Sequence, residues 1–254
     1  MMPRTFHAIA VSLGDTVSLQ GDVAHHYLRV LRAKLGEELV LSTPNGSWRA
    51  VVSRLDPSAN EVDVHVVKVE LSHDPSLQIY LAQGLAKGDK LETVIQKATE
   101  IGAAGVIVFA AERSVVKWDP ARGSSKLSRW QKVAAEAAGQ AQRDRIPAVE
   151  MVLDRHELET RITDLEIDII LLLDESERSQ GIQNALRRSG SRPTRILVVV
   201  GPEGGIADSE RQWFCEALGA LPITLGPRIL RTETAGLVAA AAILYEYGEL
   251  GGCT

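Results

Sequence analysis

Two segments near the C-terminus are rich in glycine and proline, residues that can shape a loop around a ligand. The first is Gly201-Pro202-Glu203-Gly204-Gly205, and the second runs from Leu225 to Ala235 with the sequence LGPRILRTETA. Glycine allows positive φ and a close approach of the backbone to a ligand, and proline stiffens a loop. The two segments therefore predict a cavity lined by main-chain groups.

Each segment follows a short apolar run that is typical of a buried strand, and each precedes a helical pattern. The apolar runs are Ile196 to Val200 and Leu221 to Leu225. Ligands of open α/β sheets bind at the carboxyl ends of the strands. We therefore expect both loops at one edge of a parallel sheet.

Standard phosphate-binding motifs do not describe the first segment. A Walker loop requires Lys-Ser or Lys-Thr after its last glycine, but Gly205 is followed by Ile206. The dinucleotide fingerprint fails at Glu203, whose carboxylate would also repel a phosphate. The pair of loops favours a ligand that is neutral or cationic, such as an adenosyl-sulfonium group, whereas either loop alone is equally typical of an ordinary βα turn.

The pattern of the elements changes once along the chain. Up to residue 71, apolar residues alternate with polar ones and predict a small antiparallel barrel or meander, with one helix capped by Asp22. Beyond Ser76, predicted strands alternate with helical segments, so we expect an α/β fold with a parallel sheet covered on both faces. These strands lie near residues 77–83, 105–109, 168–173, 195–200 and 221–225.

Composition is that of a globular protein. The 254 residues are 45% hydrophobic and 24% charged. No apolar run reaches the length of a membrane span, and the first residues lack the apolar core of a signal peptide, so we expect a cytoplasmic protein. The two cysteines, Cys215 and Cys253, have no metal-binding spacing and provide no disulfide framework.

Charge is distributed unevenly. The net charge is −5, yet residues 113–145 carry eight basic side chains against three acidic ones. RNA phosphates respond to such a local field, although a solvated helix face is the alternative explanation. Gln140 and Arg143 lie three residues apart in this segment and are expected on one face of a helix.

Six stretches of the chain resemble the ribosomal RNA small subunit methyltransferase E family, and the resemblance runs nearly end to end. They are GPEGG, LGPRILRTETA, GLAKGDKLETVIQKATEIG at 84–102, ERSVVK at 112–117, RWQKVAAEAAGQAQRDRIP at 129–147 and HHYLRVLRAKLGE at 25–37. The resemblance implies a PUA-like RNA-binding β-barrel over residues 1–72 and a SPOUT methyltransferase domain with a trefoil knot over residues 73–254. It also implies methyl transfer from S-adenosylmethionine to N3 of a uridine in 16S rRNA.

The resemblance further implies roles for individual residues. Arg231 is the expected catalytic residue, because its fixed charge could hold the uracil oxygens and stabilise the imide anion as the N3 proton leaves. A salt bridge to Glu233 is the alternative role for this arginine. Glu203 and Glu233 are possible general bases, the base stays unassigned, and no metal is needed.

Expected cofactor-binding residues are Leu173, Gly201, Pro202, Glu203, Gly204, Gly205, Leu225, Gly226, Ile229, Leu230 and a turn at Thr234 and Ala235. Expected RNA-binding residues are Arg4, Arg29, Arg32, Arg113, Lys117, Gln140 and Arg143.

The last helical pattern predicts a homodimer. Small and apolar residues at helical spacing would permit close approach of a second copy, although packing within one chain is the alternative. The stripe consists of Ala235, Val238, Ala239, Ala242 and Ile243. Two other functions stay open at this point: a SPOUT enzyme that methylates a ribose 2'-hydroxyl or another base, and a non-catalytic RNA-binding assembly factor.

Overall fold

In the computed structural model of the chain, which describes residues 2–187 and 191–251, the contacts divide the protein into two compact units. The N-terminal unit comprises Met1–Asp74 and Gln142–Arg145, and the C-terminal unit comprises Pro75–Ala141 and Ile146–Thr254. The division after Asp74 lies two residues beyond the expected boundary. The short return of the chain at residues 142–145 has no counterpart in the sequence analysis.

The N-terminal unit contains one five-stranded sheet in the order β1-β3-β4-β5-β2. Only β1 and β3 are parallel, and the other neighbours are antiparallel. Alternate residues of the strands, such as Val62, Val64 and Val66, are fully buried, as the period-2 pattern predicted. The strands are β1 Arg4–Phe6, β2 Thr16–Leu19, β3 Glu38–Thr43, β4 Gly46–Asp56 and β5 Glu61–Val69.

The sheet of this unit is open, because β1 and β2 are its two edges and do not pair with each other within the described chain. A closed barrel is therefore not confirmed. The predicted helix is present as α1 Gly21–His25, which continues into a π-helical turn, η1 His26–Leu31. The expected cap at Asp22 is wrong: Gln20 is the N-cap, and Asp22 lies inside the first turn.

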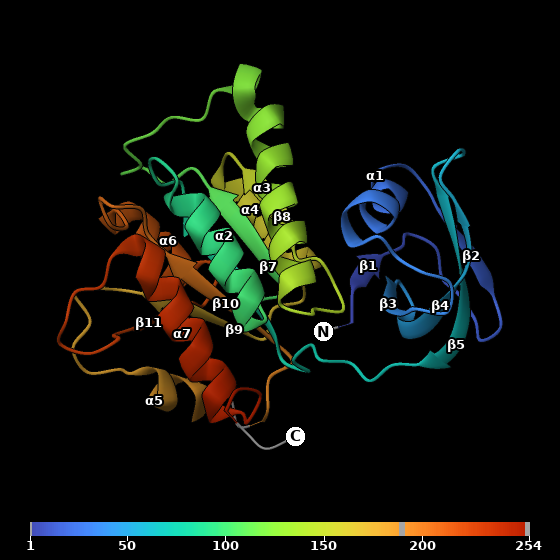
Figure 1. Cartoon of the computed structure of the whole chain (residues 1–254). Coiled ribbons are helices and arrows are strands. Elements are labelled where there is room, and N and C mark those ends of the chain that lie inside the picture. Colours follow the sequence, from blue (N-terminus) through green and yellow to red (C-terminus); the bar gives the residue numbers. More distant parts are fainter. Residues whose placement is uncertain (1, 188–190, 252–254) are drawn as a thin grey trace. The chain divides into compact units, whose positions relative to one another are not determined.

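The C-terminal unit contains a six-stranded parallel sheet in the order β11-β9-β10-β6-β7-β8 (Figure 1). Five of its strands were predicted, and the edge strand β8 was not. The last strand ends at Ile223 rather than at Leu225. The strands are β6 Gln78–Gly84, β7 Gly105–Phe109, β8 Ala148–Val152, β9 Ile169–Leu173, β10 Arg195–Val200 and β11 Leu221–Ile223.

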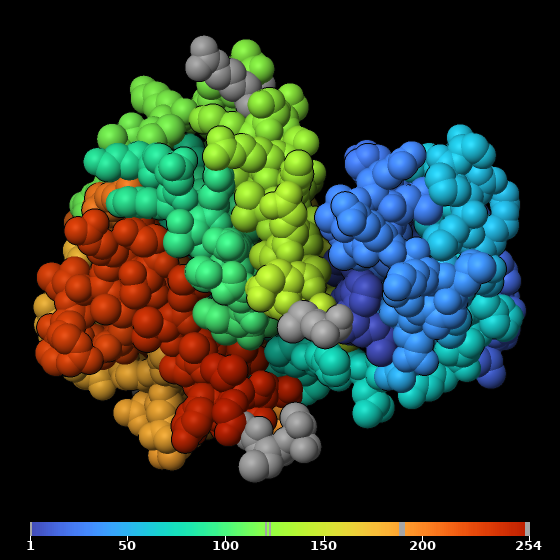
Figure 2. All heavy atoms as spheres, in the orientation of Figure 1, coloured from blue at the N-terminus to red at the C-terminus, as the bar shows by residue number. Residues whose placement is uncertain are grey.

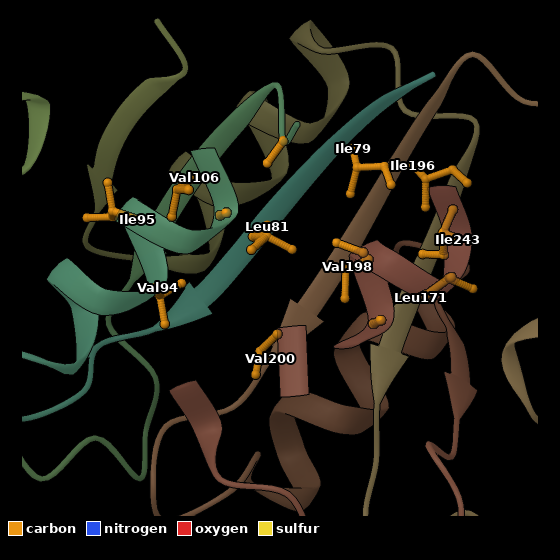
Figure 3. Packing of buried hydrophobic residues seen from close by; sticks show 14 of the residues in the cluster. Ile79, Leu81, Val94, Ile95, Val106, Leu171, Ile196, Val198, Val200 and Ile243 are labelled. Atoms are coloured by element: carbon orange, nitrogen blue, oxygen red, sulfur yellow. The ribbon is translucent and has the colours of Figure 1, made fainter. Parts of the chain in front are cut away.

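Helices cover both faces of this sheet, as the alternating pattern predicted. One face packs against α2 Lys90–Ile101, α3 Pro120–Gln140, α5 Ile182–Arg187 and α7 Thr232–Glu246. The other face packs against α4 Arg155–Asp164 and α6 Asp208–Glu216. Figure 3 shows the first of these two cores, in which Leu81 and Val198 of the sheet lie among Val94 of α2 and Ile243 of α7.

The strand order brings the predicted ligand loops together. Since β9, β10, β6 and β11 are parallel and adjacent, the loops that follow them leave the sheet at the same edge. Residues 201–207 follow β10 and lead into α6, and residues 224–231 follow β11 and lead into α7.

Candidate functional site

The first ligand loop is fixed by its neighbours. A Cβ atom at Gly204 would lie 2.7 Å from the carbonyl oxygen of Arg113, so only glycine fits against the chain that follows β7. Pro202 is buried beside it. Glu210, itself buried, accepts hydrogen bonds from the N–H of Ala207 and from that of Glu112, at 3.1 and 2.9 Å. The sequence predicted that the glycines allow close approach of the backbone to a ligand. At Gly204, the glycine instead allows close packing against the backbone of Arg113.

The second ligand loop is exposed. Gly226 has a φ of +100°, and a Cβ atom there would meet nothing within 4 Å. Ile229 is 84% exposed, and the side chain of Arg231 is 81% exposed. Leu225 and Leu230 are half-buried. The backbone and the arginine of this loop are therefore accessible to a ligand.

A polar link that the sequence analysis missed joins the two loops. The side chain of Gln83, at the end of β6, is fully buried, and its Nε2 donates to Thr232 Oγ1 at 2.8 Å. Thr232 in turn donates to the carbonyl oxygen of Gly201 at 2.6 Å. A glutamine directly after the apolar Leu81 and Ala82 in a predicted buried strand was the available signal for this site, because buried polar groups are retained where they have partners.

A second polar cluster lies at the same edge of the sheet. Lys90, in the first turn of α2, places its Nζ atom 2.9 Å from Glu203 Oε1 and 3.6 Å from Glu233 Oε2. Burial by itself would raise the pKa of Glu203, but hydrogen bonds from Lys90 and from the N–H of Lys87 lower it overall. Glu203 is therefore held as a carboxylate.

The other expected cofactor residues lie near this edge in different settings. Leu173 is the last residue of β9, is half-buried and pairs in register with Ile223. Thr234 and Ala235 do not form a turn, so that expectation is wrong. They belong to the first turn of α7, where both N–H groups donate to the carbonyl oxygen of Arg231 at 2.9 Å.

The expected RNA-binding residues fall into two groups. Arg29, Arg32, Arg113, Lys117 and Gln140 are exposed and could contact a large partner. Arg29 lies on η1, and Arg32 follows it in the left-handed conformation at φ 52°. The four charged side chains of this group, those of Arg29, Arg32, Arg113 and Lys117, form no ion pair within the described chain.

Arg4 and Arg143 form the second group, and the structure gives them a different role. The side chain of Arg4 is 1% exposed, and its Nη1 lies 2.5 Å from Asp144 Oδ1. Arg143 is also buried and forms an ion pair with Asp74. Neither guanidinium is accessible to a phosphate, so both arginines stabilise the N-terminal unit instead.

Asp144 is the centre of that buried network. Besides Arg4, its carboxylate accepts hydrogen bonds from Ser47, from Ser72 and from the N–H of His73. Burial would raise the pKa of Asp144, but these donors lower it well below its ordinary value. The segment 142–145 is therefore anchored in the N-terminal unit by charge-assisted hydrogen bonds.

The expectation that Gln140 and Arg143 share a helix face is wrong. The helix α3 ends at Gln140, and Gln142 adopts a left-handed φ of 57°. The chain therefore turns before it reaches Arg143. Gln140 is exposed on the last turn of α3 in the C-terminal unit, whereas Arg143 belongs to the N-terminal unit.

The described residues contain no cluster of three or more His, Cys, Asp or Glu side chains that could hold a metal ion. Within the same residues, no helix combines the length and apolarity needed to cross a membrane. Cys215 is half-buried, and burial raises the pKa of its thiol, while Cys253 lies outside the described residues.

Comparisons with known proteins agree on one family. A family model of the RNA methyltransferase domain matches residues 73–244. The ribosomal RNA small subunit methyltransferase E of Bacillus subtilis is 36% identical over 93% of this chain and 93% of its own length. That of Mycobacterium bovis is 34% identical over 91% of this chain and 86% of its own.

Solved structures agree as well. A ribosomal RNA small subunit methyltransferase E from Neisseria gonorrhoeae, crystallised with S-adenosylmethionine, matches with a TM-score of 0.83 and 30% identity. The match covers 97% of this chain and 98% of that one, so both units are included. Sequence and structure thus lead to the same result: the chain belongs to the ribosomal RNA small subunit methyltransferase E family.

Proposed function

We propose that the protein transfers a methyl group from S-adenosylmethionine to N3 of a uridine in 16S rRNA. The observation that carries the proposal is the meeting of two ligand loops at one edge of the parallel sheet, linked by the Thr232–Gly201 hydrogen bond. Family membership and the relative crystallised with S-adenosylmethionine support it. The exposed Arg231 of the second loop supplies a charge that could act on the base.

The residues at this edge fit the cofactor. Three buried acceptor atoms at this edge, Gln83 Oε1, Glu203 Oε2 and Glu233 Oε2, have no hydrogen-bond donor in the described part of the chain. Acidic side chains suit a ligand with a sulfonium charge. When bound, S-adenosylmethionine supplies an activated methyl group. The residues proposed to hold it are Leu173, Gly201, Pro202, Glu203, Gly204, Gly205, Leu225, Gly226, Ile229, Leu230, Thr234 and Ala235.

The protein's own tasks are to align the acceptor nitrogen, to exclude water and to stabilise the base as its proton leaves. Arg231 is proposed for the last task, since its guanidinium can donate to a uracil oxygen that gains negative charge. Glu203 is a poor general base, because its pKa is lowered and its Oε1 already accepts from Lys90. The base therefore stays unassigned.

The RNA is proposed to contact the exposed cations of both units. These cations are Arg29, Arg32, Arg113 and Lys117, and the exposed neutral amide of Gln140 is proposed to contact the RNA as well. We also propose that the N-terminal sheet is the PUA-like domain of the family and that the C-terminal unit is a knotted SPOUT domain. A substrate in the small ribosomal subunit would place the protein in the cytoplasm.

A homodimer is part of the proposal. Ala239 and Ile243 of the small-residue stripe are fully buried within the chain, so this part of the stripe packs internally. The opposite side of α7 remains uncovered, with Val238 and Tyr245 42% and 69% exposed. Figure 2 shows the C-terminal segment, in red, at the surface of its unit. We expect Val238→Lys to convert the dimer to a monomer in sedimentation experiments.

The test of the function is mass spectrometry of 16S rRNA from a strain that lacks the protein. One uridine should lose its N3 methyl group, and the purified protein should restore it on isolated small subunits or on naked rRNA. A missing methyl group on a ribose or on another base would favour the alternative SPOUT chemistry. An unchanged methylation pattern would favour the assembly factor.

A further inference from the structure

We infer that Lys90 positions Arg231 for methyl transfer by holding Glu233 away from it. The inference rests on the proposed function, since it assigns a task to a residue that has no place in the two loops. The geometry behind it is a single carboxylate shared by two cations from different elements, one on α2 and one on the loop before α7.

The two cations are unequal partners of Glu233. The side chain of Lys90 is 24% exposed, and its Nζ lies 3.6 Å from Glu233 Oε2, an ion pair without a hydrogen bond. Arg231 is 81% exposed, and its Nη1 lies 4.0 Å from Glu233 Oε1, at the outer limit of an ion pair. Exposed pairs at such distances contribute little. Lys90 is therefore the stronger partner, and Arg231 is left available to a substrate.

Lys90 is held in place by a third side chain. Its Nζ donates to Glu203 Oε1 at 2.9 Å, and that oxygen also accepts from the N–H of Lys87 at 3.2 Å. The ammonium group is thus fixed between the first ligand loop and the start of α7. Glu233 lies in the first turn of α7, and its ion pairs within the described chain are those with Lys90 and Arg231.

Removal of Lys90 should change what Arg231 contacts. A guanidinium can bind a carboxylate in a bidentate geometry, and without Lys90 no second cation would compete for Glu233. Glu233 would then draw Arg231 into a closer ion pair and away from the uracil. A lysine that merely braced the loops would behave differently, because its loss would weaken cofactor binding and methyl transfer together.

The experiment compares single-turnover methyl transfer and cofactor affinity in four variants. Lys90→Met should lower the transfer rate about 10- to 100-fold, the scale of a misplaced reacting group, with cofactor affinity within about threefold. Lys90→Arg should retain most of the rate. The double variant Lys90→Met with Glu233→Gln should recover most of the loss, because the neutral amide no longer competes for Arg231. Lys97→Met, which removes an exposed lysine of the same helix that pairs with Glu100, is the matched control and should leave the rate unchanged.

Three outcomes would overturn the inference. They are a wild-type rate in Lys90→Met, a parallel loss of cofactor affinity and transfer, and a double variant no faster than Lys90→Met. Urea denaturation of every variant separates these results from unfolding. A wild-type protein that transfers no methyl group to rRNA would instead contradict the proposed function.

Discussion

The two ligand loops have similar compositions, but one packs against neighbouring protein and the other is exposed to solvent. The loop after β10 is packed against protein: Gly204 touches the backbone of Arg113, and Glu203 is bound by Lys90. The loop after β11 presents Ile229 and Arg231 to solvent. Glycine and proline therefore signal a loop of unusual shape, and the neighbours decide whether that loop is rigid.

This difference suggests a division of labour. A loop fixed by packing is preorganised, so it can bind a ligand without a further cost in ordering. An exposed loop can adjust to a large substrate, and its charged side chain can act where charge develops in the reaction. Substitutions in the first loop should therefore affect stability and cofactor binding together, whereas loss of the exposed Arg231 in the second loop should affect transfer more than cofactor binding.

The largest effect is expected from Arg231→Ala. The rate of methyl transfer should fall by about 10²- to 10³-fold, the scale of a lost charge-stabilising donor, while cofactor affinity stays within about threefold. Single-turnover kinetics and calorimetry measure the two quantities. Arg228→Ala removes another exposed arginine of the same loop and should have a smaller effect. Near wild-type transfer in Arg231→Ala would end the proposed role.

The next effect is expected from Gly204→Val in the first loop. The new side chain must displace the carbonyl of Arg113, since even a Cβ atom would lie 2.7 Å from it. Overpacking of this kind costs about 1–3 kcal/mol of unfolding free energy, and cofactor affinity should fall with it. Gly226→Ala is the comparison, because it meets open space but must adopt a φ of +100°.

Urea denaturation and calorimetry test both glycine variants. Gly226→Ala should cost about 1 kcal/mol through backbone strain alone. Equal stability and equal cofactor affinity in Gly204→Val and wild type would show that the first loop is not fixed as described.

The smallest effect concerns pH and Glu203. Its folded-state pKa is lowered, so the carboxylate contributes stability above the unfolded value of about 4.5 and loses that contribution as the pH falls through the folded value. Glu203→Gln should therefore cost about 1 kcal/mol at pH 7, and the difference from wild type should shrink at acidic pH. Urea titrations at several pH values check this, and a difference that does not change with pH would assign the effect to packing.

Local patterns predicted most of the C-terminal fold because its strands are nearly continuous apolar runs between helical segments. The strand β8 was missed because it lacks such a continuous apolar run. It is an edge strand, it follows Pro147, and Glu150 within it forms an ion pair with Arg161 at 2.5 Å. Its pattern is therefore neither a continuous apolar run nor a clear alternation.

The candidate site was predictable to the level of its loops and no further. The composition of residues 201–205 and 225–231 marked both loops, and the strand pattern placed them at the end of the sheet. The residues that join them come from elsewhere: Gln83 lies 118 positions from Gly201, and Lys90 lies 113 from Glu203. A local sequence pattern covers only neighbouring residues, so it cannot indicate contacts between residues more than 100 positions apart.

The sequence by itself determined the family, the alternation of strands and helices and the position of both ligand loops, because each depends on neighbouring residues. Tertiary structure alone decided which arginines are accessible. Arg4 and Arg29 are both basic residues of the N-terminal unit, but Arg4 is buried against Asp144, 140 positions away, and Arg29 is exposed. The physical reason is that a buried charge is stable only when an opposite charge lies next to it. The tertiary fold determines which residue occupies that position.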